Sequence, residues 1–488
     1  NDWINVYKNI EGFNYRKEFN KFYGKMVNRY RIYCKKSILV YYYRYLIKNG
    51  LMENNSVMWT LIQKRPARNL SGVTVITVLT SPYPNGQKFS CKHNCYYCPN
   101  EPDQPRSYLK TEPAVARANR NNFDPILQME DRLHSLMVNG HELDKLEIII
   151  EGGTYTEYPK EYLEEFHRDL IYTANTYFDE IKREPYSIDE EIIENENTRV
   201  RIIGICIETR PDALIDDKGL SWLPLFRKWG VTRVQLGVQH TNNDILKKVN
   251  RGHTFEDACN AVTYLKNNCF KVDVHLMPDL PGSNAVMDKD MFDIVFNTPK
   301  LQPDQAKIYP CEVVPWTVIQ KWHQNGKYKP YAQTDERSLL DAVKYAMEIC
   351  PPWIRLPRVI RDIPLTYIEG GNMYPNLRQM LMDELEKEGK ITMDIRAREC
   401  GRNTQYNIED AIYITRKYKA NDGIEYFISL ESKDNACIFG FTRLRIPEKG
   451  FNDIEFGCLK DTALIRELHV YGNLIPVGFQ KNKDSQHK

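Results

Sequence analysis

Three cysteines on one short loop constrain this chain more than any other feature of its sequence. Cys91, Cys95 and Cys98 follow a CxxxCxxC spacing. Iron–sulfur clusters usually take four cysteine ligands. A loop that offers three leaves one iron of a four-iron cluster with an open coordination position, and an open position on a metal indicates catalysis rather than a structural role. The sequence therefore predicts a 4Fe-4S cluster with room for a substrate.

The residues before this loop support the same reading. An apolar run at 73–79 predicts a strand, and 81–86 (SPYPNG) supplies a turn. A strand followed by such a loop resembles the radical S-adenosylmethionine (SAM) enzymes, in which the open iron binds the amino acid end of SAM. A zinc knuckle with His93 as a fourth ligand is the alternative. No second CxxC pair follows nearby to complete it.

Short apolar runs alternate with longer amphipathic segments through the middle of the chain. Strands are predicted at 73–79, 146–151, 202–208, 233–238, 271–277 and 305–309. Helices are predicted between them, including 124–139, 159–176, 254–268 and 333–349. This alternation predicts a parallel sheet with right-handed crossovers. The expected fold class is α/β, with a partial TIM-like (β/α)6 barrel of the radical SAM type over residues 71–385.

Polar residues follow the predicted strands at the same end. Active sites of such barrels gather where the strands end. Gly152 and Gly153 lack Cβ atoms, so the backbone there can approach a ligand closely. Glu208 either binds ribose hydroxyls or holds Arg210, and both readings remain open. We expect the cofactor-binding residues to include Gly152, Gly153, Thr154, Glu208, Arg210 and Gln239, with Tyr309 at the sixth strand.

The first 70 residues carry an unusual charge. They hold 14 Lys or Arg against 4 Asp or Glu, although the whole chain has a net charge of only +2. Residues 21–49 are predicted to form helices, and they contain seven tyrosines: Tyr23, Tyr30, Tyr33, Tyr41, Tyr42, Tyr43 and Tyr45. Basic residues interleaved with aromatic rings suit RNA. An amphipathic segment with a solvated basic face is the alternative. A neighbouring catalytic domain with a large substrate favours RNA.

Residues 386–488 form a third region. Strands are predicted at 410–416, 424–431, 436–446 and 462–471, after a boundary near 385–405. The apolar runs are too short to cross a membrane. Twelve cysteines without a disulfide pattern indicate a reducing compartment, so we expect a cytoplasmic protein.

Several longer strings identify a resemblance. The chain is similar to the catalytic subunit of the Elongator complex, a radical SAM and acetyltransferase-like protein that modifies the wobble uridine of tRNA. The resemblance runs from about residue 60 to the end. Besides the cysteine loop, its strings begin at Arg65, Gly152, Ile207, Leu236, Asn250, Met277, Arg361 and Arg466 (RPAR, GGT, IETRPD, LGVQ, NRGHT, MPDLP, RDIP and RELHVYG).

This resemblance implies a reaction and its partners. A SAM-derived radical would take a hydrogen from the methyl group of acetyl-CoA, the carbon would add to C5 of the uridine, and thioester hydrolysis would leave a carboxymethyl group. Acid–base catalysis by side chains does not activate a methyl group in this way. Lys145, Glu208 and Tyr309 are the expected catalytic residues. The expected partners are the tRNA anticodon stem-loop and either Elongator-like subunits or a second copy. Contacts to acetyl-CoA are expected from Lys145, Glu467, Leu468, His469 and Val470.

Two departures from the family bear on the C-terminal region. Acetyltransferase domains of this family bind the coenzyme pyrophosphate at a glycine-rich turn that opens a helix. The sequence ends at Gln486-His487-Lys488, where that turn would begin, so we expect an incomplete GNAT-like α+β domain. A cysteine cluster of some members is reduced here to Cys400, so zinc is not expected. The alternatives are a tRNA-binding scaffold with a degenerate acetyl-CoA site, and a different radical SAM modification of RNA.

Overall fold

A parallel sheet of seven strands forms a half-open barrel. The computed structural model describes residues 15–64, 71–403, 405–448 and 454–472. Neighbouring strands are parallel and follow one another in sequence order. They are β1 (Thr74–Leu79), β2 (Lys145–Glu151), β3 (Arg201–Thr209), β4 (Val231–Gln239), β5 (Lys271–Leu276), β6 (Gln305–Ile308) and β7 (Arg355–Arg358). β1 and β7 are the two edges of this sheet, so the barrel stays open between them.

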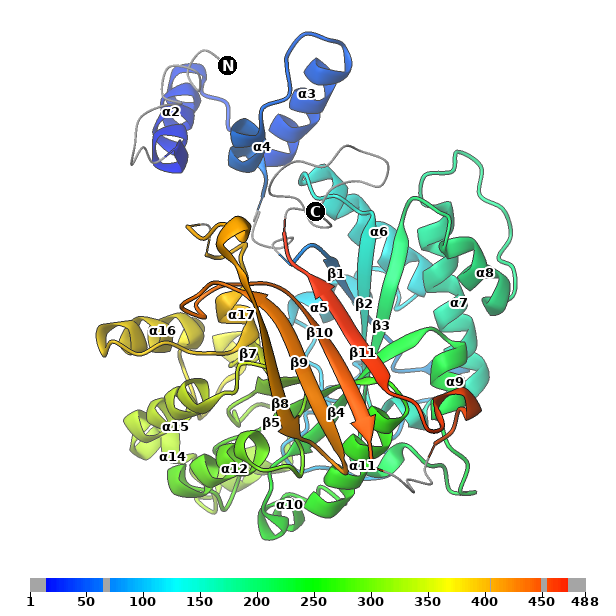
Figure 1. The fold of residues 1–488 in the computed structure, drawn as a ribbon, viewed down its shortest axis with the longest axis vertical. Helices are drawn as coiled ribbons and strands as arrows, with labels where there is room; N and C mark the ends of the chain where they lie inside the picture. Colours follow the sequence, from blue (N-terminus) through cyan, green and yellow to red (C-terminus); the bar gives the residue numbers. More distant parts are fainter. Residues whose placement is uncertain (1–14, 65–70, 404, 449–453, 473–488) are drawn as a thin grey trace.

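Helices cover the outer side of the barrel (Figure 1). The helices lie there because alternate side chains of the strands point outward and must be buried. In β2 these are Leu146, Ile148 and Ile150, which lie in the core that the sheet shares with the helices. The intervening residues of β2 face the barrel interior. The helices around the barrel are α5 (Pro113–Arg120), α6 (Pro125–Val138), α7 (Lys160–Thr176), α8 (Ile188–Asn195), α9 (Leu223–Lys228), α10 (Asn243–Lys248), α11 (Phe255–Asn267), α12 (Ala285–Asn297), α13 (Val318–Gln324), α14 (Tyr331–Thr334), α15 (Glu336–Ile349) and α16 (Leu377–Lys387).

The six predicted strands and the alternation with helices are confirmed. The structure adds β7, which the sequence analysis did not predict. This strand has only four residues, and Leu356 is its one fully buried side chain. The other three residues of the strand are Arg355, Pro357 and Arg358. A short edge strand with a proline has no apolar periodicity to reveal it.

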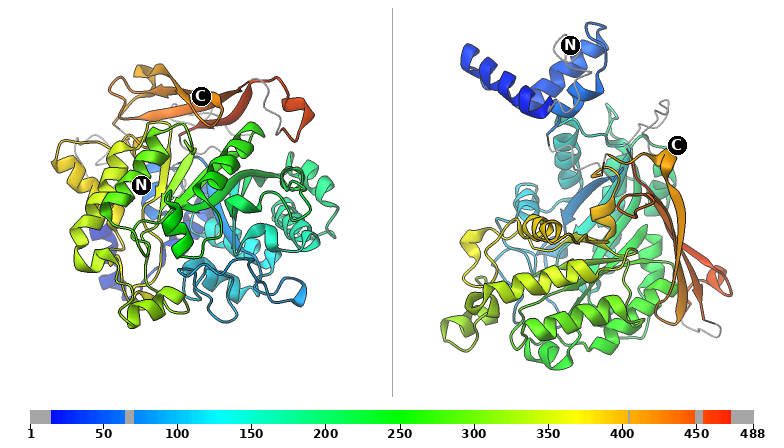
Figure 2. Two further views of the ribbon diagram at one scale, coloured as in Figure 1. Left: turned by 90° about the horizontal axis from the view of Figure 1, so that it is seen from below. Right: turned by 60° about the vertical axis from the view of Figure 1, so that its left-hand side comes forward.

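A second sheet packs against the barrel as a separate layer (Figure 2). Its antiparallel strands are β8 (Ile412–Lys419), β9 (Gly423–Glu431), β10 (Ile438–Pro447) and β11 (Leu464–Val470), in the order β11-β10-β9-β8. The short helix α17 (Ile395–Arg398) lies between the two sheets in sequence. Arg466 of β11 binds Asp304, just before β6, and Lys271 at the start of β5 pairs with Glu467. The second sheet therefore meets the barrel where β5 and β6 begin.

Three helices stand apart from this body at the N-terminal side (Figures 1 and 2). They are α2 (Tyr15–Tyr30), α3 (Lys36–Lys48) and α4 (Ser56–Ile62). The guanidinium of Arg44 donates to the carbonyl of Met137, at the end of α6, at 2.9 Å. Because α6 leads into β2, this attachment lies at the end of the barrel where the strands begin. None of the described helices is long and apolar enough to cross a membrane.

Candidate radical SAM site

The cysteine loop lies at the opposite end of the barrel, where the strands finish. It follows β1 and is held by the segment after α10, because the Tyr96 amide donates to the Val249 carbonyl and the Asn250 side chain donates to the Asn94 carbonyl, both at 2.9 Å. Its sulfurs face a pocket of about 120 Å³. The other walls of that pocket include Gly152, Gly153, Thr154, Glu208, Arg210 and Gln239. The structure thus brings the predicted cofactor-binding residues of the barrel together.

Cationic side chains surround the thiols. Arg251 approaches the Cys95 sulfur to 3.4 Å and Arg210 approaches it to 3.7 Å. Burial raises the pKa of the Cys95 thiol, but these two guanidinium groups lower it by more than burial raises it. The net pKa of Cys95 is therefore below the ordinary value for a thiol. Arg106 donates to the Cys98 sulfur at 3.4 Å. Cations beside a thiol favour the thiolate, which is the form that binds metal. At Cys98 burial outweighs the effect of Arg106, and the pKa of that thiol is raised.

The residues fit an iron–sulfur cluster better than a single metal ion. Within the described part of the chain, no three side chains of His, Cys, Asp or Glu gather closely enough to hold one ion. Each cysteine of a cluster ligates its own iron, so the three sulfurs need not converge on one point. His93 faces Asp212, with 3.8 Å between ring nitrogen and carboxylate oxygen. The zinc alternative therefore lacks its fourth ligand in this geometry.

The two glycines after β2 lie so close to neighbouring side chains that a Cβ atom at either position would clash. A Cβ atom at Gly152 would lie 2.0 Å from the Thr80 hydroxyl oxygen, and one at Gly153 would lie 2.1 Å from the Phe89 ring. Thr154, next in sequence, places its hydroxyl 3.5 Å from the Cys91 sulfur. The absence of Cβ atoms therefore lets the backbone after β2 pack closely against Thr80 and Phe89, and this segment brings Thr154 to the cysteines.

Glu208 lies where the cysteine pocket joins a larger cavity. It accepts a hydrogen bond from the Tyr108 hydroxyl at 2.7 Å, and Lys307 lies 3.7 Å away. Arg210 pairs instead with Asp212, through two contacts of 3.0 Å. The sequence left two roles open for Glu208, binding ribose or holding Arg210. Because Arg210 pairs with Asp212, the contacts do not support the second role. The carboxylate stays available to the pocket.

The larger cavity, of about 540 Å³, occupies the barrel interior. Its wall carries Glu147, Glu151, Lys307 and Tyr309 from the inner faces of the strands, with Glu312 at the rim. Burial, and then the neighbouring Glu208, raise the pKa of Glu151 to about 7. Burial also raises the pKa of Glu312 to about 8. Both carboxyl groups can therefore exchange a proton near neutral pH.

Gln239 has a strained backbone beside the same pocket. Its φ is 69°, a left-handed conformation that residues other than glycine seldom adopt. Its side-chain carbonyl is buried and has no hydrogen-bond partner among the described residues. Strain and an unsatisfied polar atom together are typical of a ligand-binding position.

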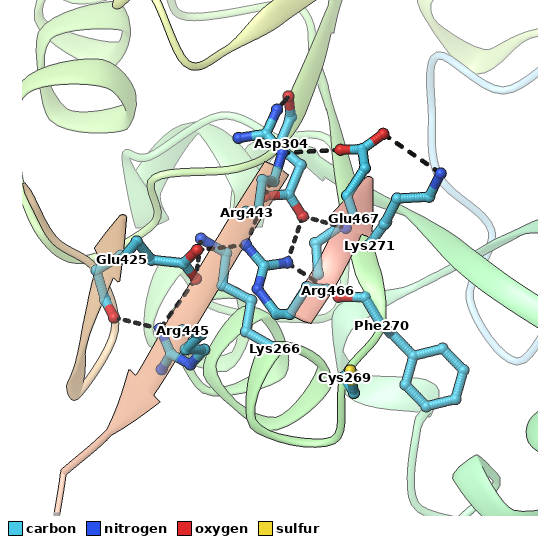
Figure 3. A network of polar contacts seen from close by, with 12 residues as sticks. Lys266, Cys269, Phe270, Lys271, Asp304, Glu425, Arg443, Arg445, Arg466 and Glu467 are labelled. Atoms are coloured by element: carbon cyan, nitrogen blue, oxygen red, sulfur yellow. Dashed lines mark hydrogen bonds and ion pairs between the residues drawn. The ribbon is translucent and has the colours of Figure 1, made fainter. Parts of the chain in front are cut away.

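The predicted contacts to acetyl-CoA lie elsewhere. Lys145 is the first residue of β2, roughly 20 Å from the glycines at ~3.3 Å per residue. Glu467 is near that end, but Arg443 holds its carboxylate at 2.8 Å and Lys271 lies 3.4 Å away (Figure 3). His469 bonds to the carbonyl of Ser71, whereas Leu468 is 73% exposed. Val470 ends the strand. The structure does not bring these residues to the cysteines.

Sequence reasoning missed two residues at the cysteines. Arg251 belongs to a string that the resemblance picked out, but no role was assigned to it. Arg106 lies in the connection between the cysteine loop and α5, where no periodic pattern exists. Only the folded loop shows that their guanidinium groups reach the sulfurs.

Comparison with known proteins follows the same lines. Residues 89–294 match the Radical SAM superfamily, and residues 303–387 match the Radical_SAM C-terminal domain. The tRNA uridine(34) acetyltransferase of Methanocaldococcus infernus is 36% identical over 477 residues, covering 93% of this chain and 85% of that protein. Elongator complex protein 3 of Homo sapiens is 33% identical over 448 residues, covering 88% and 78%.

A solved structure agrees with these relatives. The archaeal Methanocaldococcus infernus Elp3 with an N-terminal deletion is 35% identical to this chain and superposes with a TM-score of 0.69, covering 83% of this chain and 84% of that one. The cysteine pocket and strands β2 to β7 lie within the two matched radical SAM regions, and β1 precedes them. The chain belongs to the Elongator complex protein 3 family of radical SAM proteins.

Proposed function

We propose that this protein modifies the wobble uridine of tRNA, adding a carboxymethyl group to C5 with carbon from acetyl-CoA. The observation that carries the proposal is the set of three cysteines facing a pocket that opens beside the barrel cavity. Relatives that are named tRNA uridine(34) acetyltransferase and Elongator complex protein 3 support uridine 34 of tRNA as the target. The carboxymethyl product is the finer part of the proposal.

The cysteine pocket would hold the two cofactors. Cys91, Cys95 and Cys98 would bind a 4Fe-4S cluster, and the backbone of Gly152 and Gly153 would lie against SAM. The bound pair supplies a 5′-deoxyadenosyl radical, which can take a hydrogen atom from a methyl group that acid–base chemistry leaves untouched. The protein's task is to position the reacting carbons and keep water away from them.

The barrel cavity that adjoins the cysteine pocket carries side chains that can bind a substrate and transfer protons. After a carbon radical adds to C5 of a uridine, the ring would have to lose the C5 proton and one electron, and that electron would return to the oxidised cluster. Glu151, with its pKa near 7, is suited to accept such a proton. Tyr309 and Lys307 line the same wall and can donate hydrogen bonds to a base.

Acetyl-CoA is proposed to bind at the second sheet. The carboxylate of Glu467 is occupied by Arg443 and Lys271, so its side chain is not free for a ligand. Strand β11 is the edge of the described sheet, and its outer backbone edge can pair with an extended ligand. Lys145 lies at the same end of the barrel. We infer that the backbone of β11, rather than the Glu467 side chain, would contact the coenzyme.

The N-terminal helices are proposed to bind the tRNA. Tyr30, Tyr33 and Tyr41 expose 59%, 73% and 65% of their surface. Such rings among arginines and lysines can stack on unpaired bases while the cations meet phosphates. Because these helices lie at the end of the barrel opposite the cysteines, the anticodon stem-loop would have to extend along the molecule to reach them both.

Mass spectrometry of tRNA nucleosides tests the proposal. Reconstituted, reduced protein with SAM and acetyl-CoA is expected to convert uridine 34 to carboxymethyluridine. Cys95→Ser should abolish the product, the cluster absorbance and the release of 5′-deoxyadenosine. Cys458→Ser, at an exposed cysteine, is the matched control and should leave all three intact.

Other results would point to the alternatives. If tRNA binds but does not stimulate acetyl-CoA hydrolysis, the scaffold reading is favoured. If uridine 34 gains a different group, the radical chemistry stands and the acetyl-CoA part of the proposal fails. Product formation by the Cys95→Ser variant would contradict the cluster assignment itself.

A further inference from the structure

Guanidinium groups are distributed unevenly around the three sulfurs. The Cys95 sulfur accepts hydrogen bonds from the guanidinium groups of Arg251, at 3.4 Å, and Arg210, at 3.7 Å. The Cys98 sulfur accepts one from Arg106 at 3.4 Å. The Cys91 sulfur lies instead 3.5 Å from the neutral hydroxyl of Thr154. Positive charge therefore gathers on the side of the pocket formed by Cys95 and Cys98.

The three arginines differ in how their charge is balanced. Arg210 is neutralised by the carboxylate of Asp212, through two contacts of 3.0 Å. Arg251 donates to the carbonyl of Gly237 at 2.6 Å, and Arg106 donates to the side-chain carbonyl of Asn94. Throughout the described ranges, no carboxylate lies within ion-pairing distance of Arg106 or Arg251. The Cys95 and Cys98 sulfurs are therefore the acidic groups that these two guanidinium groups contact directly, and Asp212 acts on Arg251 only from farther away.

We propose that Arg106 and Arg251 are positioning residues that raise the reduction potential of the iron–sulfur cluster bound at Cys91, Cys95 and Cys98. This inference rests on the proposed function, because it needs those cysteines to hold a cluster. One-electron reduction adds a negative charge to the cluster. A nearby cation and a hydrogen bond to a ligand sulfur both stabilise the reduced form more than the oxidised one.

Arg106 separates this role from a merely structural one. Arg251 is buried and also fixes the Gly237 carbonyl of β4, so its loss would disturb the fold. Arg106 is half-buried, and its side chain donates hydrogen bonds to Cys98 and Asn94, which both belong to the cysteine loop. Removing its charge should leave the barrel intact and change the electrostatics of the cluster.

The test is a reduction titration of cluster-loaded protein with dithionite, followed by electron paramagnetic resonance. A hydrogen bond to a charged group can change an equilibrium about tenfold. Arg106→Gln should therefore lower the midpoint potential by about 59 mV, the one-electron value of a tenfold change. Arg106→Lys keeps the charge but loses the planar fork, so it should give a smaller decrease. Arg120→Gln removes an exposed arginine of α5 and should give the wild-type potential.

Iron content, measured on the same samples, separates the possible failures. Wild-type protein that takes up no iron after anaerobic reconstitution would contradict the proposed function. Full iron content with equal potentials in Arg106→Gln and Arg120→Gln would overturn this inference alone. If Arg106→Gln loads iron poorly, the comparison of Arg106→Lys and Arg251→Lys with the wild type decides, and unchanged potentials in both would equally overturn it.

Discussion

Two groups of buried charges in this molecule have opposite character. The first joins the second sheet to the barrel, where Arg466 binds Asp304 at 2.7 Å and Glu425 at 2.7 Å, and Arg443 binds Glu467 at 2.8 Å (Figure 3). The second lines the barrel cavity, where Glu151 and Glu312 lie among polar groups. We call these the interface network and the cavity group.

The pKa values of their carboxyl groups show the contrast. In the interface network, burial raises the pKa of Glu467, but Lys271 and then Arg443 lower it more, to about 2. The same balance, with Arg466 as the main cation, keeps the pKa of Asp304 well below its usual range. In the cavity group, burial prevails, and the pKa values of Glu151 and Glu312 rise to about 7 and about 8.

The difference separates structural charges from functional ones. A buried acid whose charge is fully compensated stabilises one arrangement of the chain and has no capacity left for a ligand. A buried acid without compensation carries a cost that folding alone does not explain, and such groups gather at functional sites. The interface network therefore fixes the second sheet on the barrel, whereas the carboxyl groups of the cavity group remain the candidates for a functional role.

The largest effect is expected from breaking the interface network. Arg466→Met leaves Asp304 and Glu425 buried without their principal cation. Breaking a buried pair from one side costs roughly 3–5 kcal/mol. Denaturant unfolding followed by circular dichroism should show a loss of this size, or separate unfolding of the second sheet. Arg337→Met, at an exposed ion pair, is the control and should cost at most about 1 kcal/mol. Equal losses in both variants would contradict the structural role of the network.

An intermediate effect on the free energy of unfolding is expected from neutralising one carboxyl group in the interface network and one in the cavity group. The two changes should have opposite signs. The pKa of Glu467 is depressed from 4.5, so its charge stabilises the fold above pH 4.5, and this contribution disappears as the pH falls towards about 2. The pKa of Glu151 is raised from 4.5, so its cost is absent at low pH, and grows as the pH rises from 4.5 to about 7. At pH 8, Glu467→Gln should destabilise and Glu151→Gln should stabilise, each by at most about 3 kcal/mol.

The measurement is the free energy of unfolding as a function of pH. The gain in Glu151→Gln should shrink between pH 7 and pH 4.5, whereas the loss in Glu467→Gln should persist there. Glu386→Gln, at an exposed carboxylate of α16, serves as the control. If both acids shift stability in the same direction at pH 8, the distinction between the two groups is wrong.

The sequence predicted the framework of this molecule better than its buried charges. Strands β8 to β11 were predicted near their observed positions because their alternation is clear. Alternation defines two faces but does not say which one is buried. In β10 the buried face carries Arg443 and Arg445, while Ile446 on the other face is 42% exposed. Arg443 is buried there beside Asp304 of the barrel, which is distant in sequence, and Arg445 is buried beside Glu425 of β9.

The candidate site divides in the same way. The cysteines and the Gly152–Gly153 pair could be found from local spacing, because one loop or one strand end provides them. The approach of Arg210 and Arg251 to the Cys95 sulfur depends on how segments distant in sequence fold over the cysteine loop. The raised pKa of Glu151 depends first on its burial in the folded barrel and then on β3, which brings Glu208 beside it. Such properties arise from contacts between elements, which periodicity does not encode.

The smallest effect concerns the uncharged part of the same interface. Tyr418 of β8 stacks on Trp353, just before β7, with ring centroids 4.3 Å apart and planes 10° from parallel. Such a pair contributes about 0.5–1.5 kcal/mol beyond the area it buries. Tyr418→Leu should therefore cost about 1 kcal/mol in denaturant unfolding, and Tyr413→Leu, on the same strand but 82% exposed, should cost less. Because the ring pair and the interface network hold the same two layers, a loss in Tyr418→Leu as large as that in Arg466→Met would mean that apolar stacking, not charge compensation, docks the second sheet.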